Sequence, residues 1–341
     1  MKLEDIGFYT LTDDRVANAS HSSILSRCEL VLTSRCNFNC PYCRGVGGPD
    51  VSYSDAGKVV KLWASEGLRN IRFSGGEPTL YRGIFDLCEM ARDLAIERIA
   101  ISTNGSASQV TYGKMISSGV NDFSVSLDAC CAEDGERMAG GIKGVFDVIV
   151  NNIEWLSRRV YTTVGVVLTE TNVESIGGII GLADSLGVHD IRIIPAAQNG
   201  DRFSSIRIDP DIVRKYPILR YRVGNFQTRR PVRGLSGSDS CKCGLVLDDM
   251  AVNQGKHFPC IIYMREFGKP IGLVGDNMRE ERKRWYVSND THCDPICKTN
   301  CLDVCVEYNN KFANMNPMAH RQSNQHMHRT EPVMCVLAGM V

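Results

Sequence analysis

Three cysteines in one short segment are the residues of this chain best suited to chemistry. Cys36, Cys40 and Cys43 follow an apolar stretch in the pattern C-x3-C-x2-C. Thiolates at close spacing bind iron–sulfur clusters, and three thiolates leave one iron of a four-iron cubane without a protein ligand. That iron can bind another molecule. The pattern therefore predicts a reactive iron–sulfur centre.

A structural zinc site is the main alternative for a group of cysteines. Such sites use four Cys or His ligands, usually close together in the sequence. Residues 29–60 contain neither a histidine nor a fourth cysteine. The spacing therefore favours the iron–sulfur cluster, and Tyr42 beside the last cysteine suits a wall that shields it.

Apolar runs that resemble strands alternate with amphipathic stretches over residues 28–195. The predicted strands are Cys28–Thr33, Asn70–Ser74, Arg98–Thr103, Asn121–Leu127, Thr162–Leu168 and His189–Ile194. The stretches between them predict helices near 54–66, 83–95, 107–118, 144–159 and 173–186. Repeated strand–helix pairs with right-handed crossovers form a parallel sheet. We expect an α/β fold, a partial (β/α)6 barrel of the TIM type, with functional residues at the carboxyl ends of its strands.

Polar groups follow several predicted strands at that end. Gly75, Gly76 and Glu77 come after the second strand, where glycines let a ligand approach the backbone and a carboxylate accepts hydrogen bonds from an ammonium group. Asn104 follows the third strand, and Ser126 and Asp128 lie at the end of the fourth. Such residues are also common in turns and helix caps. Their positions predict a polar rim around the cysteine loop.

The cysteine loop and the Gly-Gly-Glu element together resemble the radical SAM superfamily, over about residues 28–195. The resemblance implies that S-adenosylmethionine binds the open iron and is cleaved reductively to a 5'-deoxyadenosyl radical, which abstracts substrate hydrogen. The electron would come from a reductant such as flavodoxin or ferredoxin. The residues assigned to the bound cofactor are Tyr42, Gly75, Gly76, Glu77, Asn104, Ser126, Asp128 and Arg137, with Val166, Ile194 and Pro195 near the adenine. A surface role is the alternative for Arg137.

A second group of cysteines lies in the later part of the chain. Cys243, Gly255 and Cys260 form C-x11-G-x4-C, and four more cysteines follow at every fourth position. The candidate metal ligands are Cys243, Cys260, Cys293, Cys297, Cys301 and Cys305. Asp294, Pro295 and Asn300 favour a loop around a metal over a helix. Cys241 is a spare that could replace Cys243 as a ligand.

The first half of this pattern resembles the SPASM and twitch extensions of radical SAM enzymes, which hold auxiliary four-iron clusters. The even steps between the last four cysteines depart from the SPASM spacing, and Cys335 is the one distant candidate. The resemblance implies a small cysteine-rich domain with one auxiliary cluster, or with two.

Composition limits the class of protein. The chain has 341 residues, with 39 basic and 39 acidic side chains, so nothing attracts it as a whole to nucleic acid or to an anionic membrane. It has no apolar run long enough to span a membrane and no signal-peptide pattern, so we expect a cytoplasmic protein. Fifteen cysteines, an odd number, favour metal clusters over a complete disulfide framework.

Five segments are expected along the chain. They are an N-terminal extension at 1–27, the barrel core at 28–195, a basic linker at 196–235, the auxiliary iron–sulfur domain at 236–310 and a C-terminal tail at 311–341. The linker carries the arginines Arg202, Arg207, Arg214, Arg220, Arg222, Arg229, Arg230 and Arg233. Most such runs are solvated surface. The alternative is that a few of these guanidinium groups hold an anionic group of the substrate.

Three functional hypotheses follow. The first is an oxidative radical SAM enzyme with an auxiliary cluster that modifies a ribosomal peptide. The second is a small-molecule enzyme resembling the molybdenum-cofactor GTP cyclase, from whose auxiliary C-x2-C-x13-C spacing this chain differs. The third is a zinc or iron–sulfur scaffold or electron carrier. An intact Gly-Gly-Glu element favours the first two.

Overall fold

A single open sheet organises the protein. The computed structural model describes residues 13–197 and 206–316, and in this part of the chain the strand order is β6-β5-β4-β3-β2-β1-β7-β8-β9. The strands from β6 to β7 pair in parallel, and β8 and β9 continue the sheet in antiparallel pairing. The strands are β1 (Arg27–Thr33), β2 (Asn70–Gly75), β3 (Arg98–Thr103), β4 (Asp122–Ser126), β5 (Tyr161–Leu168), β6 (Asp190–Pro195), β7 (Asp249–Asn253), β8 (Lys256–Phe258) and β9 (Gly272–Leu273).

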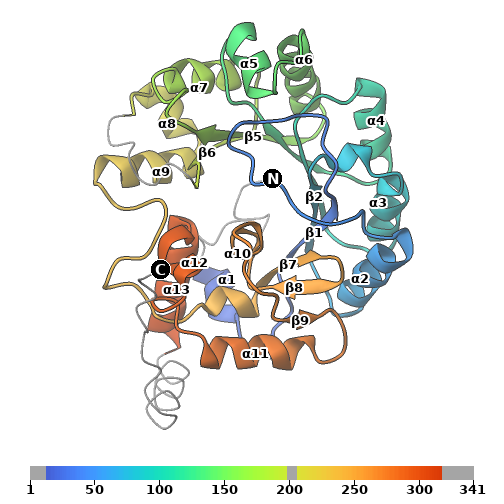
Figure 1. The fold of residues 1–341 in the computed structure, drawn as a ribbon, viewed down its shortest axis with the longest axis vertical. Helices are drawn as coiled ribbons and strands as arrows, with labels where there is room; N and C mark the ends of the chain where they lie inside the picture. Colours follow the sequence, from blue (N-terminus) through green and yellow to red (C-terminus); the bar gives the residue numbers. More distant parts are fainter. Residues whose placement is uncertain (1–12, 198–205, 317–341) are drawn as a thin grey trace, which may run out of the picture.

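Helices connect the parallel strands and lie outside the curved sheet (Figure 1). The helices of the first half are α1 (Asp13–Asn18), α2 (Tyr53–Ser65), α3 (Ile84–Asp93), α4 (Gln109–Ser117), α5 (Ala132–Met138), α6 (Val145–Ser157) and α7 (Ile176–Ser185). Those of the second half are α8 (Pro210–Lys215), α9 (Pro217–Gln227), α10 (Ile261–Arg265), α11 (Met278–Ser288), α12 (Pro295–Asn300) and α13 (Asp303–Met315), with short 3-10 turns at Pro78–Leu80 and Gly244–Leu247. The expected partial barrel with a cysteine-rich C-terminal region is confirmed. None of the described helices is both long and apolar enough to cross a membrane.

Alternation along the strands separates an apolar outer face from a polar inner face. Successive side chains of a strand point to opposite faces, so Ile71 and Phe73 of β2 join the apolar core, while Arg72 and Ser74 face the other way. The same alternation holds on β1, β3, β4 and β6. The apolar face packs against the surrounding helices, and its burial is the main stabilising contribution of this half of the chain.

The inner face carries paired charges near the amino ends of the strands. Asp122 on β4 accepts a hydrogen bond from Nε of Arg98 on β3 at 3.2 Å. The guanidinium of Arg72 on β2 forms an ion pair with the same carboxylate at 3.6 Å. Asp190 and Arg192 of β6 form a further buried pair at 3.1 Å. Burial lowers the pKa of Arg72 to about 10, and Asp122 opposes that shift. Buried charges require such partners because an isolated buried ion is costly.

The second half of the chain extends the barrel sheet. Strand β7 pairs in parallel with β1, so residues expected as a separate domain share the sheet of the first half. The N-terminal helix α1 contacts α13, and it lies among the C-terminal elements in Figure 1. Arg15 of α1 forms an ion pair with Asp248, directly before β7.

Three expectations for the later segments need correction. The segment from Cys293 to Cys305 was expected as a loop, but it contains α12 and the start of α13. Asp294 caps α12 by accepting hydrogen bonds from the backbone N–H groups of Ile296 and Cys297, and Pro295 occupies its first turn. An Asp N-cap followed by proline is a helix-start signal, which outweighed the turn propensity.

The expected linker contains α8 and α9, and the tail expected after 310 begins within α13. The rest of that tail, with Cys335, and Arg202 of the linker lie outside the described residues.

A buried arginine ties the barrel to the cysteine-rich half. Arg222 of α9 donates hydrogen bonds to the carbonyl of Ile193 on β6 and forms an ion pair with Asp303 at 2.8 Å. Asp303 also accepts from the side-chain amide of Asn225 at 2.8 Å. The side chains of Arg222 and Asp303 are almost completely buried. Arg222 is therefore a structural member of the basic segment, not a solvated one.

Replacing Asp303 with alanine should strongly destabilise the protein, by about 3–5 kcal/mol, because the buried guanidinium of Arg222 would lose its counter-ion. Thermal unfolding of the anaerobically purified protein measures the effect. Glu154→Gln is the control, because its pair with Arg158 on α6 is exposed and should contribute less than about 1 kcal/mol. Equal midpoints of thermal unfolding for the two variants would show that the ion pair of Arg222 with Asp303 does not stabilise the protein.

Candidate active site

The loop that follows β1 is fixed at both ends. The hydroxyl of Thr33, the last residue of β1, donates a hydrogen bond to Asp50, and the Arg35 guanidinium pairs with the same carboxylate. Further along, the N–H of Val51 donates to the carbonyl of Leu32 at 2.9 Å. These contacts close the loop on itself at the carboxyl end of the sheet. The three cysteines between them are therefore held at the position expected from the sequence.

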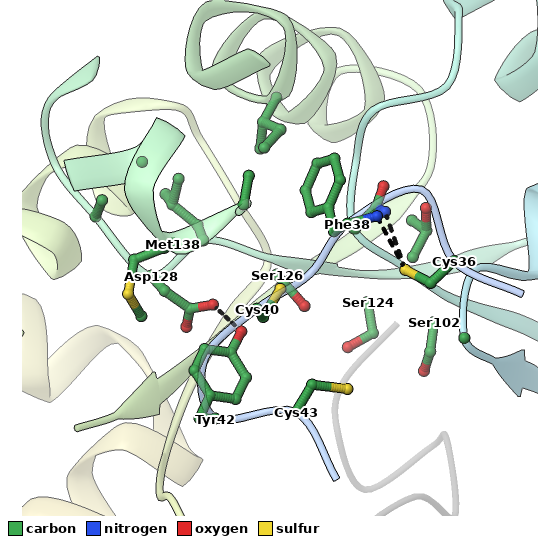
Figure 2. A pocket seen from close by; sticks show the side chains of 18 of the residues that line it. Cys36, Phe38, Cys40, Tyr42, Cys43, Ser102, Ser124, Ser126, Asp128 and Met138 are labelled. Carbon is green, nitrogen blue, oxygen red and sulfur yellow. Dashed lines mark hydrogen bonds between the residues drawn. The ribbon is translucent and has the colours of Figure 1, made fainter. Parts of the chain in front are cut away.

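Cys36, Cys40 and Cys43 line one cavity, which we call the cluster cavity (Figure 2). Its volume is about 230 Å³. Backbone N–H groups of Phe38 and Gly45 donate to the sulfurs of Cys36 and Cys43 at 3.4 and 3.3 Å. Burial raises the pKa of Cys40 to about 12. Thiolates here therefore need a nearby cation, which an iron–sulfur cluster supplies.

Tyr42 and Asp128 join the cysteine loop to the end of β4. The Tyr42 hydroxyl donates a hydrogen bond to one oxygen of Asp128 (Figure 2). The backbone N–H of Val167 donates to the other oxygen at 2.6 Å. Burial raises the pKa of Asp128 to about 6, while the two hydrogen bonds lower it. Both side chains line the cluster cavity. They fix its wall as well as offering polar groups to it.

The glycines and the glutamate of the Gly-Gly-Glu element have different roles. Gly75 and Gly76 line the cluster cavity, and a Cβ on either would lie 2.4 Å or less from a backbone oxygen of the cysteine loop segment, so only glycine fits. Glu77 does not line the cavity and is completely buried. Its carboxylate accepts hydrogen bonds from the Thr103 hydroxyl at 2.9 Å and from the Asn104 N–H at 2.7 Å. Glu77 therefore joins the ends of β2 and β3.

The other residues assigned to the cofactor also divide into those that line the cluster cavity and those that do not. Asn104 and Ser126 line the cluster cavity, and the Asn104 side chain donates to Asn37 of the cysteine loop at 2.8 Å. Arg137 of α5 pairs with Asp134 and does not line it. Val166 lies in the apolar core, whereas Ile194 and Pro195 line a second space.

Sequence reasoning missed several residues of the cluster cavity. The inner-facing serines Ser74, Ser102 and Ser124 line it, together with Phe38, Met138 and Arg265. The alternation of serine with apolar residues along β2, β3 and β4 is a signal that could have revealed the serines. Arg265 lies on α10, far away in the sequence, and no local pattern marks it.

A second space adjoins the first, and we call it the central chamber. Its volume is about 410 Å³, and it shares Tyr42, Cys43, Ser102 and Arg265 with the cluster cavity. The end of β6 and residues of the cysteine-rich half complete its wall. The chamber therefore connects the cysteine loop to the second half of the chain.

Five cysteines of the second half line a third space, the cysteine cavity. They are Cys243, Cys260, Cys297, Cys301 and Cys305. Cys260 and Cys305 also line the central chamber. Of the candidate ligands, Cys293 is exposed and does not line the cysteine cavity, because it precedes the N-cap of α12.

The donor set of the cysteine cavity fits an iron–sulfur cluster. Burial raises the pKa of Cys260 to about 12, and the neighbouring Cys243 adds to that rise. Buried thiols in one space cannot ionise together without a cation. Among the described residues no three His, Cys, Asp or Glu side chains are gathered around the position of a single ion. A cubane binds each thiolate to a different iron, so its ligands surround a space instead of converging on a point.

Comparison with known proteins assigns the first half of the chain. Residues 30–183 match the family model of the radical SAM superfamily. The match covers a little under half of the chain and identifies a radical SAM domain at these residues. Radical SAM enzymes carry a four-iron cluster that binds S-adenosylmethionine. The three thiols of the cluster cavity, its glycine backbone and its polar side chains fit these two groups.

Curated relatives share about half their length with this chain. It is 27% identical over 175 residues to the probable GTP 3',8-cyclase of Sulfurisphaera tokodaii, which covers 48% of this chain and 54% of that protein. It is 30% identical over 149 residues to the probable GTP 3',8-cyclase of Methanococcus maripaludis, covering 42% of this chain and 47% of that protein.

Solved structures of radical SAM proteins share the fold over a longer stretch. Streptococcus suis SuiB has a TM-score of 0.55 at 15% identity, covering 78% of this chain and 67% of its own. The structure of native anSMEcpe with bound S-adenosylmethionine has a TM-score of 0.56 at 16% identity, covering 88% of this chain and 100% of its own. At such identity the likeness concerns the fold alone.

Replacing Glu77 with glutamine should destabilise the radical SAM part by about 1–3 kcal/mol, because the new amide would face hydrogen-bond donors. Thermal unfolding measures the change. Glu97→Gln is the matched control, since Glu97 pairs with Arg69 at the surface and should contribute about 0.5 kcal/mol or less. A Glu77 variant as stable as the control would show that this carboxylate does not hold the strand ends together.

Alanine at the lining cysteines of the cysteine cavity should lower bound iron by about four atoms per chain for at least four of the five positions. Iron counting on anaerobically reconstituted protein measures this. Cys293→Ala and Cys131→Ala are controls, because both thiols are exposed and lie outside the cysteine cavity. Iron loss in Cys293→Ala, with none in Cys301→Ala, would contradict this ligand set.

Proposed function

We propose that the chain uses S-adenosylmethionine to oxidise a substrate held in the central chamber, with an auxiliary iron–sulfur cluster in the cysteine cavity. When bound, the first cluster and S-adenosylmethionine supply a 5'-deoxyadenosyl radical that removes hydrogen from an unactivated C–H bond. The order of the three spaces carries the proposal. The central chamber shares wall residues with the cluster cavity on one side and with the cysteine cavity on the other.

The chain's own residues shape the boundary between the cluster cavity and the central chamber. Tyr42 and Asp128 hold the cysteine loop against β4, so the mouth between cluster cavity and central chamber keeps its shape. Ser102 and Cys43 line both spaces, which brings substrate and cofactor to one boundary. Cys260 and Cys305 line the same chamber, so an auxiliary cluster held by them would be placed to accept an electron released by substrate oxidation. A one-electron donor such as flavodoxin or ferredoxin would serve as the external reductant.

Two substrate classes remain candidates. A ribosomal peptide is the first, since a peptide segment can place one residue in a chamber of this size. A small molecule such as a nucleotide is the second, and the names of the curated relatives favour it. The density of charged groups in the chamber wall suits a polar substrate in either class.

The reconstituted enzyme should form 5'-deoxyadenosine from S-adenosylmethionine and dithionite under anaerobic conditions. Alanine at Cys36, Cys40 or Cys43 should lower this yield by at least about a hundredfold, because each removes a cluster ligand. Cys131→Ala is the control, since this exposed thiol lies outside all three spaces. Chromatography of the nucleoside products is the measurement. Wild-type protein with a full complement of iron that forms no 5'-deoxyadenosine would overturn the proposal.

A further inference from the structure

Arginine is the most frequent charged residue in the wall of the central chamber. The wall contains the guanidinium groups of Arg27, Arg44, Arg72, Arg233 and Arg265 and the carboxylates of Glu29, Asp249 and Glu266. Among the described residues of the wall, positive groups therefore outnumber negative ones, although the chain as a whole is neutral. A local excess of one charge in a cavity attracts ligands of the opposite charge.

The three carboxylates are bound to arginines on other parts of the wall. Arg27 reaches Glu29 at 2.8 Å and Asp249 at 3.0 Å. Arg44 of the cysteine loop pairs with Glu266 at 2.9 Å. Each carboxylate thus already has a cation beside it, and none of these contacts involves Arg265.

Arg265 is the arginine of the chamber wall whose guanidinium is placed to bind an anionic ligand. It is the last residue of α10, five residues after Cys260, and its side chain is only partly exposed. Its guanidinium donates to the carbonyl of Gly75 at 3.4 Å, and within the described residues it forms no ion pair. A partly buried guanidinium loses hydration without gaining a counter-ion, which is unfavourable unless a ligand supplies one.

Arg233 places a second guanidinium in the same wall. Its Nε donates to the carbonyl of Pro195 at the end of β6 at 2.8 Å, and its backbone pairs with Leu302 between the last two cysteines of the cavity. These contacts fix the side chain at the junction of the barrel and the cysteine-rich half. Among the described arginines of the basic segment, Arg233 is thus the one that lines the central chamber.

We propose that the arginine-rich wall of the central chamber binds an anionic substrate group, a carboxylate or a phosphate, with Arg265 as the principal guanidinium and Arg233 as a second one elsewhere in the same wall. A planar guanidinium binds both groups through two parallel hydrogen bonds. The inference rests on the proposed function, because it assumes that the substrate occupies this chamber. It narrows both substrate classes, to a peptide with an acidic or C-terminal carboxylate or to a phosphorylated or carboxylated small molecule.

The test is calorimetric titration of the anaerobically reconstituted chain, saturated with S-adenosylmethionine, with inorganic phosphate and separately with succinate. Wild-type protein should bind at least one of these anions, and Arg265→Gln and Arg233→Gln should each weaken that binding about tenfold or more. Arg265→Lys should retain part of it as a point charge. Arg214→Gln is the control, because Arg214 lies on α8, is exposed and pairs with Asp211. Tighter binding of phosphate assigns a phosphoryl group, and tighter binding of succinate assigns a carboxylate.

Absence of binding of both anions to the wild-type protein would overturn the proposed anion binding. So would weakened binding of S-adenosylmethionine by Arg265→Gln with anion binding unchanged, because Arg265 also lines the cluster cavity and would then hold the cofactor. Formation of 5'-deoxyadenosine by the wild-type protein is measured in parallel. Its absence alongside intact anion binding contradicts the proposed function, whereas its presence without anion binding contradicts the proposed anion binding alone.

Discussion

The parallel pairing of β1 with β2 on one side and β7 on the other determines where everything else lies. Parallel strands end at the same edge of a sheet, so the cysteine loop after β1 meets the glycines after β2. The pairing with β7 brings the second half of the chain to the same strand, although more than two hundred residues separate them. The cluster cavity, central chamber and cysteine cavity follow from this arrangement.

The polar interior of the barrel is the second consequence of the sheet. Barrel interiors are commonly filled by branched apolar side chains. Here charged pairs occupy the amino ends of the strands and serines the carboxyl ends, which leaves space for ligands above them. Each buried charge needs a partner, and Arg222 with Asp303 extends this requirement to the join between the two halves. Binding sites and structural support are thus built from the same residue types.

The sequence predicts the barrel strands to within about two residues because apolar periodicity and glycine turns are local signals. The cysteine loop is equally local. The role of Glu77 could not be predicted, since its partners Thr103 and Asn104 belong to another strand. The equal spacing of the cysteines in the sequence also gave no sign that Cys293, unlike Cys297, lies outside the cysteine cavity. The start of α12 separates the two residues in space. The position of Arg265 at the site depends on tertiary contacts alone, so no local sequence pattern predicts it.

The proposed function requires two iron–sulfur sites, one on either side of the central chamber. Electron paramagnetic resonance of the dithionite-reduced, reconstituted protein, recorded with and without S-adenosylmethionine, distinguishes two such sites from one. We expect two cluster signals, of which S-adenosylmethionine changes only one, because a four-iron cluster held by Cys36, Cys40 and Cys43 alone would leave one iron open toward the cofactor. A single signal that S-adenosylmethionine changes completely would contradict it.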